Sequence, residues 1–246
     1  MKQSSLIDYT LHLADNALIL GQRNTEWCGH GPILEQDIAI TNISLDLVGQ
    51  ARSFYQYAAQ LKADGSTEDS LAYLRTERDF KNCLLVEQPN GDWAQTILRQ
   101  FLFSSYQYFL YQELQKNSDE TLAAIAEKSL KEVSYHLRWS SEWVIRLGDG
   151  TNESHSRILK AIDELWRYTG ELFIPVAYEK EAGVDVSLLK NDWSEKVKAV
   201  LTEATLPVPE NIFMQTGGKT GTHTEHLGYI LTELQYVQRA YPGCEW

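Results

Sequence analysis

Residues 122–147 read LAAIAEKSLKEVSYHLRWSSEWVIRL, and the spacing of their side chains decides the fold class. Apolar or small residues recur every three or four positions, at Leu122, Ile125, Ala126, Ser129, Leu130, Val133, Leu137, Ser140, Val144 and Leu147. This period places them on one face of an α-helix. Ser118 suits the N-cap of this helix, and Gly148 suits its C-terminal end. The stretch therefore predicts a helix over residues 119–147 that buries one face.

Prolines are scarce in the rest of the chain, which favours long helices there as well. Six prolines occur, and neither residues 33–88 nor residues 90–174 contain one. A proline inside a helix costs about 3 kcal/mol, so proline-free spans suit helices. Apolar spacing predicts helices at residues 5–20, 33–62, 67–87, 92–116, 119–147, 153–173, 187–203 and 222–240. We predict an all-α protein, with residues 1–246 in one helical-bundle domain framed by the four helices between residues 33 and 147.

The composition excludes several classes of protein. The chain has 246 residues, of which 43% are apolar and 11% aromatic, so it carries enough apolar surface to fold and is not a disordered chain. Its 34 acidic residues outnumber its 22 Lys and Arg residues, which gives a formal net charge of -12. A field of this sign repels phosphate, so we expect no nucleic-acid partner.

The expected setting is the reducing cytoplasm. No run of 18 or more uncharged apolar residues occurs, so no membrane partner or span is expected. Charged and polar side chains interrupt the apolar residues near the N-terminus, which argues against an export signal, at Asp8, His12 and Asp15. The three cysteines form no Cys-x-x-Cys pair, so neither a zinc cluster nor a disulfide framework is supported.

Two of the predicted helices, 33–62 and 92–116, are apolar on more than one side. The first carries one apolar stripe through Leu34 and Leu45 and another through Ile43 and Leu47. A helix of this kind either lies at the centre of a bundle or is covered by a partner subunit. Both explanations stay open from the sequence.

Long bundles with inward carboxylates often hold a pair of iron atoms, and such a centre has a recognisable set of ligands. It uses one Glu from each of two helices and a Glu-x-x-His motif on each of the other two. The residues three positions before the six histidines are Tyr9, Trp27, Val133, Asn152, Thr220 and His223. No Glu-x-x-His therefore exists in this chain.

Degenerate metal-site positions are still visible in this pattern, at Asp46, Glu77, Glu132 and His136. Glu77 is followed at the third position by Phe80, which is no imidazole. Glu132 and His136 stand four residues apart and share a helical face, so they either form a buried hydrogen-bonded pair or ligate a single metal ion. We expect the structural pair, and no metal in this chain.

Residues 217–226 combine a glycine-rich turn with Lys219, His223 and His226. No strand precedes this turn and its glycine spacing is not that of a phosphate loop, so nucleotide hydrolysis is rejected. His223 and His226 would share a face at the start of the helix 222–240. The three side chains are candidates for contact with an anion or a partner's carboxylate, and an ordinary capped helix start is the alternative.

A second group of candidates lies in the predicted helix 67–87, where Arg75, Arg78 and Lys81 step by three. A solvated face balanced by nearby acids is one explanation. The other is contact with a partner's carboxylates or with a phosphate-rich ligand such as coenzyme A, because guanidinium and ammonium groups bind phosphates and carboxylates. The candidates for this contact are Arg75, Arg78, Asp79, Phe80, Lys81 and Asn82.

Five blocks of sequence, in order and at similar spacing, resemble one known family. They are residues 26–30 (EWCGH), 42–52 (NISLDLVGQAR), 85–91 (LVEQPNG), 131–138 (KEVSYHLR) and 216–228 (TGGKTGTHTEHLG), and Trp246 ends the chain. The resemblance is to the C subunits of bacterial phenylacetyl-CoA 1,2-epoxidases, the ring-oxygenating multicomponent monooxygenases of phenylacetate catabolism.

This resemblance implies a ferritin-like helical bundle that has lost its di-iron centre. In that family the homologous A subunit holds the iron and performs the epoxidation, and the C subunit pairs with it and supports it. A small B subunit and a reductase with flavin and iron–sulfur cofactors complete the system. The implied role is a non-catalytic structural subunit with no catalytic residue of its own. Two alternatives stay open: a metal-dependent oxygenase using Glu132, His136 and Asp46, and a self-associating bundle with no acyl-CoA role.

Overall fold

Helix α6 (Glu120–Gly148) matches the stretch that decides the fold class. It begins where the Asp119 side chain accepts a hydrogen bond of 2.9 Å from the backbone N–H of Leu122, as an N-cap residue does. Leu122, Val133 and Val144 are buried along one face. The predicted N-cap, Ser118, lies one residue too early, and the predicted buried face is confirmed.

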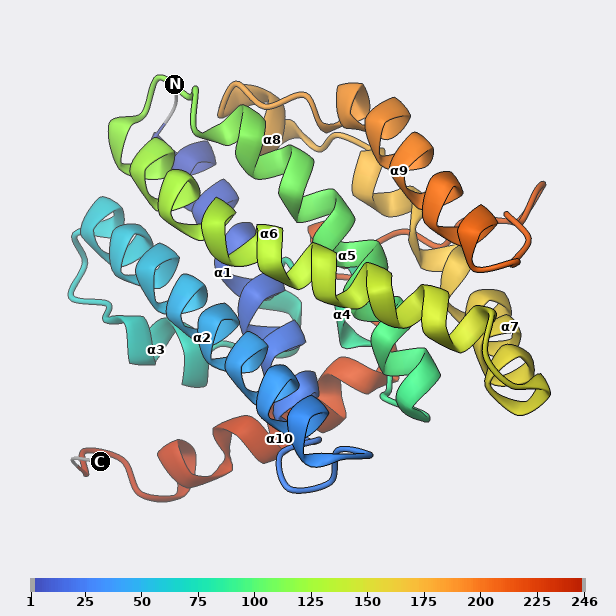
Figure 1. Ribbon diagram of the computed structural model, residues 1–246. Helices are drawn as coiled ribbons and strands as arrows, with labels where there is room; N and C mark the ends of the chain where they lie inside the picture. The colour runs from blue at the N-terminus through green and yellow to red at the C-terminus, as the bar shows by residue number, and fades with distance from the viewer. Residues whose placement is uncertain (1–2, 245–246) are drawn as a thin grey trace. The chain divides into compact units, whose positions relative to one another are not determined.

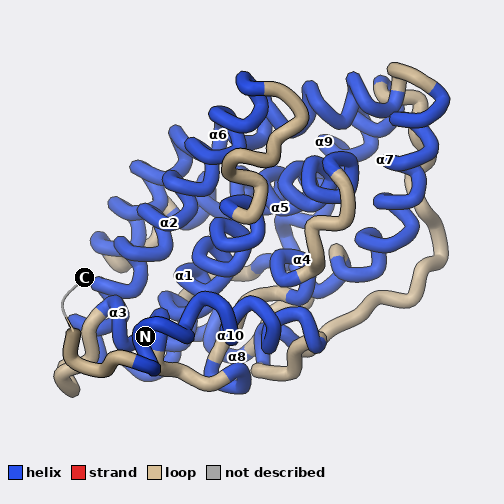
Figure 2. The backbone as a smooth tube through the Cα atoms, turned by 90° about the horizontal axis from the view of Figure 1, so that it is seen from below, coloured by secondary structure: helices blue, strands red, loops and turns tan. Residues whose placement is uncertain are grey.

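The structure is a computed structural model that describes residues 3–244, so that Trp246 lies outside the described residues. Within this range the chain forms helices and loops and no strand (Figures 1 and 2). The α-helices are α1 (Gln3–Thr25), α2 (Leu34–Lys62), α3 (Glu68–Tyr73), α4 (Leu84–Glu87), α5 (Trp93–Leu114), α6, α7 (Asn152–Leu165), α8 (Ala177–Glu181), α9 (Lys190–Glu203) and α10 (Glu225–Ala240). Short 3-10 helices are η1 (Glu77–Asp79), η2 (Trp166–Tyr168), η3 (Gly170–Phe173), η4 (Val186–Leu189) and η5 (Gly218–Thr220). The predicted all-α class is confirmed.

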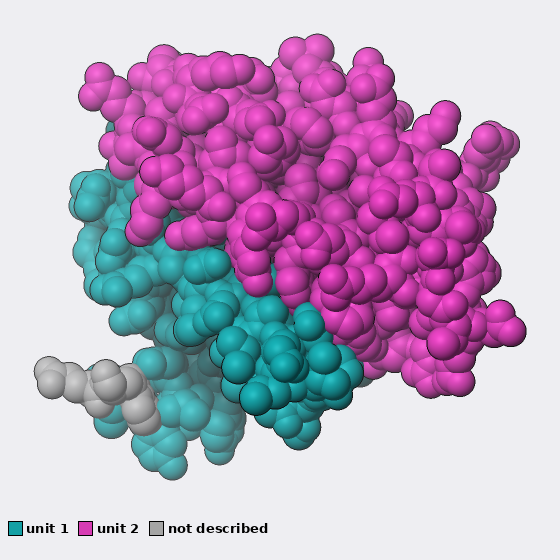
Figure 3. All heavy atoms as spheres, viewed as in Figure 1, with its two compact units in different colours: residues 1–88, 176–182, 217–246 teal, residues 89–175, 183–216 magenta. Residues whose placement is uncertain are grey.

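The chain divides into two compact units, coloured separately in Figure 3. Unit 1 consists of Met1–Gln88, Val176–Ala182 and Gly217–Trp246. Unit 2 consists of Pro89–Pro175 and Gly183–Thr216. That residues 1–246 behave as one domain stays a prediction.

Unit 1 is built on the pair α1 and α2, which pack along each other. Most of α1 is buried, and the shorter helices α4, α8 and α10 also contact it. Polar side chains lie among its buried apolar ones, notably His12, Asp15 and Asn16. Buried polar groups need hydrogen-bond partners. We therefore expect this face of α1 to be held by hydrogen bonds as well as by apolar packing.

Unit 2 is built around α5, which packs against α6, α7 and α9. Its aromatic side chains Phe101, Phe103 and Tyr106 are buried, and Tyr106 meets Phe173 edge to face. Within unit 2 the helix 92–116 thus takes the central position, and cover by a partner subunit stays a prediction.

The predicted helix over residues 67–87 is wrong. Helix α3 ends at Tyr73, and the Thr76 and Asp79 side chains then close the 3-10 turn η1, with Asp79 accepting a bond of 2.9 Å from the Thr76 N–H. Local side-chain bonds of this kind compete with a continuous helix. The absence of proline permitted a helix here but did not require one. The fourth long helix is instead α1, which extends the predicted helix 5–20 to residues 3–25.

Two other predicted helices change their bounds. Helix α10 begins at Glu225 rather than at residue 222, so His223 precedes the helix and does not share a helical face with His226. The predicted helix 153–173 ends as an α-helix at Leu165 and continues as the 3-10 turns η2 and η3.

Candidate functional site

The candidate residues 75–82 lie in unit 1, on a segment whose backbone is bonded to the side chains of α1. Asp15 accepts a bond of 2.8 Å from the N–H of Lys81, and Asn16 accepts one of 2.8 Å from the N–H of Cys83. The Nδ1 of His12 lies 2.7 Å from the Lys81 carbonyl oxygen, so it donates there. Three side chains at positions i, i+3 and i+4 of one helix thus replace the partners that a continuous helix would supply.

The side chain of Arg75 is bound to partners inside unit 1. Its guanidinium forms an ion pair with Asp15, whose carboxylate is fully buried, and donates to the Asp79 carbonyl oxygen at 3.0 Å. The guanidinium also lies 4.2 Å from the centre of the Phe80 ring, in a cation–π contact. Burial opposes the charged form of Arg75, but Asp15 together with Tyr55 and Asp79 outweighs it, so the pKa of Arg75 is raised. This group is therefore a permanent positive charge that balances Asp15.

A second buried ion pair joins Lys219 to Glu179. The two groups lie 2.8 Å apart with almost no exposure to solvent. Glu179 also accepts a bond of 2.9 Å from the N–H of Val176, and the Tyr178 hydroxyl donates to the Lys219 carbonyl oxygen at 2.9 Å. The carboxylate that Lys219 contacts therefore belongs to this chain.

The glycine-rich turn at residues 217–221 packs directly against the backbone of residues 78–84. A Cβ atom at Gly218 would lie 2.3 Å from the carbonyl oxygen of Asn82. Gly221 has a positive φ of 82°, and a Cβ there would lie 2.4 Å from the carbonyl oxygen of Arg78. Only glycine permits this approach at both positions. The turn is thus a packing device rather than a phosphate loop.

The Glu87 carboxylate links the residues just before α10 to residues 80–83. Its Oε2 accepts from Asn82 Nδ2 and from His223 Nδ1, each at 2.8 Å, and its Oε1 accepts from the Thr224 N–H at 2.7 Å and the Thr224 hydroxyl at 2.8 Å. The other ring nitrogen of His223 lies 2.9 Å from the Phe80 carbonyl oxygen. A carboxylate with four hydrogen-bond donors is satisfied inside the protein.

His12 and His223, both in unit 1, hold different charge states. Both ring nitrogens of His223 face acceptors, which only an imidazolium can satisfy. Burial lowers its pKa, but the bond and charge of Glu87 together with the Phe80 carbonyl outweigh this, so the pKa of His223 is raised. His12 donates through Nδ1, and its Nε2 lies 3.2 Å from the amide nitrogen of Asn16, which donates to it. Burial is the main cause that lowers the pKa of His12, which is therefore neutral.

The predicted contact residues thus separate into two groups. Phe80 and Asn82 are fully buried, and Arg75 is largely so, with internal partners for each. Arg78 and Asp79 are exposed, and Lys81 is partly exposed, 3.5 Å from Asp8. Lys219 and the His223 side chain are buried against carboxylates of this chain, while His226 is partly exposed. Contact of any of them with acyl-CoA or a partner stays a prediction.

The degenerate metal-site positions lie on three different elements, α2, η1 and α6. Glu132 and His136 lie one turn apart on α6 in unit 2, and Asp46 lies on α2 in unit 1. Glu77 stands on η1, 3.5 Å from where a Cβ of Gly228 would lie. Within residues 3–244, no three His, Cys, Asp or Glu side chains gather closely enough to hold a metal ion. That this chain holds no metal stays a prediction.

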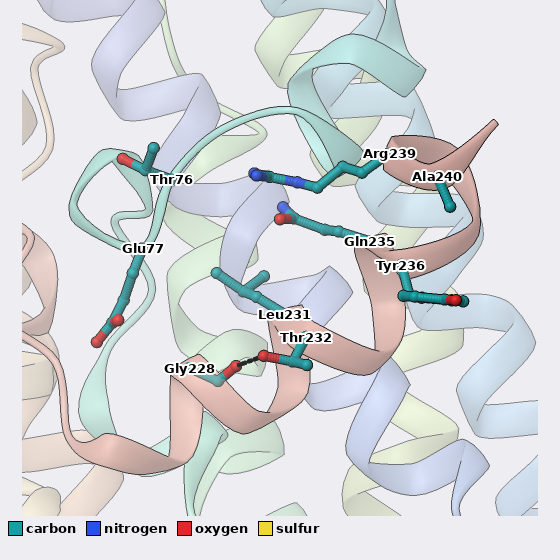
Figure 4. Close-up of a pocket in the computed structure, with 9 residues that line it drawn as sticks. All are labelled: Thr76, Glu77, Gly228, Leu231, Thr232, Gln235, Tyr236, Arg239 and Ala240. Atoms are coloured by element: carbon teal, nitrogen blue, oxygen red, sulfur yellow. Dashed lines mark hydrogen bonds between the residues drawn. The ribbon is translucent and has the colours of Figure 1, made fainter. Parts of the chain in front are cut away.

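An open hollow of about 730 Å³ lies beside α10 in unit 1 (Figure 4). Thr76 and Glu77 line one side, and Leu231, Gln235 and Arg239 from α10 line the other. Arg239 points toward the first side, where it donates to the carbonyl oxygens of Leu74 and Arg75 at 3.4 and 2.9 Å. These bonds satisfy carbonyl groups at the end of α3, so Arg239 stabilises the fold.

Sequence reasoning missed the polar side chains of α1 and the buried carboxylates of Glu87 and Glu179. A signal for α1 was present, because His12, Asp15 and Asn16 stand at i, i+3 and i+4 in an otherwise apolar helix. Such a polar patch on a buried face indicates a buried network. Glu87 and Glu179 carried no such signal, because their charged partners lie 136 and 40 residues away in the sequence.

A further feature of unit 1 is the outer side of α2. Large apolar side chains are exposed there, at Leu34, Ile38, Leu45 and Val48. They are one of the two apolar stripes seen in the sequence, and the other stripe, through Ile43 and Leu47, is buried. For this helix the fold within the chain uses only one of its two apolar sides.

Comparison with known proteins gives the same assignment from end to end. The family described as "Phenylacetic acid catabolic protein" matches residues 1–246. The chain is 50% identical to the C subunit of the 1,2-phenylacetyl-CoA epoxidase of Escherichia coli (strain K12), over 99% of this chain and 100% of that protein. The ferritin-like, all-α fold class predicted from the sequence agrees with this match. No helix in residues 3–244 is both long and apolar enough to cross a membrane. The chain belongs to the family of phenylacetic acid catabolic proteins.

Proposed function

We propose that this chain is a non-catalytic structural subunit of a phenylacetyl-CoA 1,2-epoxidase complex. In this role it pairs with the di-iron A subunit and supports it during aerobic phenylacetate degradation in the cytoplasm. The observation that carries the proposal is the 50% identity to the C subunit of the E. coli epoxidase over the full length of both chains. Substrate oxidation would then be the task of the A subunit, with electrons from the flavin and iron–sulfur reductase, and the small B subunit would complete the assembly.

Two features of this chain support a structural role. Its sequence contains no Glu-x-x-His motif, so the imidazole ligands that a bundle uses to hold two iron atoms are missing from the chain itself. The charged groups buried in unit 1, such as Asp15, Glu87 and Glu179, are paired with groups of the same chain. Their chemistry is that of a fold-stabilising network, since each carboxylate already has its donors.

The test reconstitutes the complex from separately purified subunits. Metal content and epoxide formation from phenylacetyl-CoA are measured for this chain alone, for the A subunit alone, and for the mixture, each with the reductase and its electron donor. We expect this chain alone to carry no stoichiometric iron and to form no epoxide, and we expect the mixture to be at least about tenfold more active than the A subunit alone, a difference of about 1.4 kcal/mol in the barrier.

The same experiment identifies the alternatives. Stoichiometric iron in the isolated chain together with oxygenation would make it a metal-dependent oxygenase. A chain that only self-associates, and that neither binds the A subunit nor changes its activity, would be a structural bundle without an acyl-CoA role.

A further inference from the structure

The outer face of α2 carries a regular apolar stripe. The fraction of each side chain exposed is 71% for Leu34, 52% for Ile38, 64% for Leu45 and 41% for Val48. With Thr41 between them, these residues follow one another at alternating steps of four and three positions. This is the spacing of a helix face that packs against another helix. Ile33, just before α2, adds a further side chain that is 53% exposed.

The side chains of this stripe are largely exposed, and Val48 at its end also lies near Gly21 of α1. The opposite side of α2 packs against α1 and holds the buried residues Ile40, Ile43 and Leu47. Scattered exposed leucines are common, but four large apolar side chains aligned on one helix are typical of an interaction site. From Leu34 to Val48 the stripe is about 21 Å long, at 1.5 Å per residue, which is the length of four helical turns.

The surface is also open enough for a helix to approach closely. Gly49 lies on the exposed side of α2, and a Cβ atom placed there would meet nothing within 4 Å. The start of α2 is held in place, because the Asp37 carboxylate accepts a bond of 2.9 Å from the Gly31 N–H.

Charge indicates what kind of partner fits. Residues 24–52 contain four acids, Glu26, Glu35, Asp37 and Asp46, and one base, Arg52. Arg52 is paired with Glu68 of this chain at 3.5 Å, so the surroundings of the stripe are acidic. Glu35 and Asp46 flank the apolar stripe on the side of α2 that turns toward Asn42. If two copies of this chain met through this face, carboxylates would oppose carboxylates, which disfavours association. A helix with Lys or Arg beside its apolar seam would be complementary.

We infer that the outer face of α2 is the docking surface for a helix of a different polypeptide, one with an apolar seam flanked by basic residues. The inference rests on the proposed function, because that function supplies a protein partner, and it adds the surface and the chemistry of recognition. Leu45 and Ile38, at the middle of the stripe, are the main apolar anchors. Glu35 contributes charge complementarity at the edge.

The test measures the dissociation constant between this chain and the A subunit. Leu45→Glu combined with Ile38→Glu places carboxylates in the seam, and we expect binding to weaken about 100-fold, which is about 2.7 kcal/mol. Glu35→Lys is expected to weaken binding about threefold at low salt and not at high salt. The matched control is Leu188→Glu, which changes a leucine that is 73% exposed on η4 in unit 2, and it should bind as the wild type does.

Circular dichroism and thermal unfolding of each variant show whether its fold is intact, which is expected because all the altered side chains are exposed. Equal binding by wild type and by the double variant would overturn this inference and leave the proposed function standing. A wild-type chain that does not bind the A subunit would overturn both. Light scattering that shows a wild-type homodimer, dissociated by the same two substitutions, would overturn the assignment to a different polypeptide.

Discussion

At the scale of single residues, the buried network of unit 1 works through matched protonation states. His223 is an imidazolium between Glu87 and a backbone carbonyl, and His12 is a neutral ring that donates to another carbonyl. Both histidines bond to the same segment, residues 80–83, yet folding raises the pKa of His223 and lowers the pKa of His12. Burial is the main cause that keeps His12 neutral, whereas the acceptors around His223 together outweigh burial and keep it charged.

The dependence of stability on pH should therefore have two separate parts. The pKa of His223 is raised on folding, so its contribution is complete below the unfolded value of about 6.5 and is lost as the pH rises through the folded pKa. The pKa of His12 is lowered, so its contribution is present above about pH 6.5 and is lost as the pH falls through the folded pKa. Urea unfolding between about pH 5 and pH 9 measures both.

The variant His223→Gln isolates the alkaline part. It should flatten the loss of unfolding free energy above about pH 6.5 while leaving the acid side unchanged. An alkaline slope that is the same in this variant and in the wild type would contradict the imidazolium assignment.

The ion pair between Asp15 and Arg75 gives a second prediction at this scale. Asp15→Asn leaves a largely buried guanidinium without its counter-charge, so we expect the free energy of unfolding to fall by about 3 kcal/mol. The control is Lys116→Ala, which breaks an exposed ion pair with Glu113 and should change little. Chemical denaturation of both variants decides, and an equal, small effect would mean that Asp15 does not hold residues 75–81.

At the scale of elements, the sequence predicts helices well where one apolar stripe is sustained and poorly where polar side chains meet over long distances. The helices 33–62, 92–116 and 119–147 correspond to α2, α5 and α6 within a few residues. The helix predicted for residues 67–87 is not formed, because the backbone of Lys81 and Cys83 is bonded to side chains of α1. Apolar periodicity does not reveal such long-range bonds. The buried network could likewise not be predicted from the sequence, apart from its polar residues on α1, His12, Asp15 and Asn16.

The glycine turn at residues 217–221 is the element whose fit is easiest to disturb. Gly218→Ala would drive a Cβ into the Asn82 carbonyl oxygen, so we expect a loss of about 2 kcal/mol or more in unfolding free energy. Gly49→Ala is the matched control, because this helical glycine faces open space and alanine there should stabilise by about 0.5 to 1 kcal/mol. Thermal and urea unfolding of the two variants should therefore shift in opposite directions, and shifts in the same direction would refute the packing role of the turn.

At the scale of the whole molecule, neither unit is a continuous piece of chain. Unit 1 is assembled from three segments and unit 2 from two, so the chain passes from one unit to the other four times. This connectivity supports the prediction that residues 1–246 unfold as one domain. Five tryptophans report on unit 2, namely Trp93, Trp139, Trp143, Trp166 and Trp193, whereas far-ultraviolet circular dichroism reports on both units.

We expect the fluorescence and circular dichroism transitions to coincide in urea, as they do for a two-state domain. The variant Trp27→Phe removes a tryptophan of unit 1 and sharpens the comparison. A fluorescence transition displaced from the circular dichroism transition would show that unit 2 unfolds separately.

The central claim is that this chain contributes to epoxidation by supporting a catalytic partner. The most direct measurement is the rate of epoxide formation from phenylacetyl-CoA, with iron content, for the chain alone and after it is mixed with the A subunit and the reductase. The account predicts no iron and no product for the chain alone, and activity that rises in proportion to the complex formed. Iron bound by the isolated chain together with product formation, or an A subunit equally active without this chain, would contradict it.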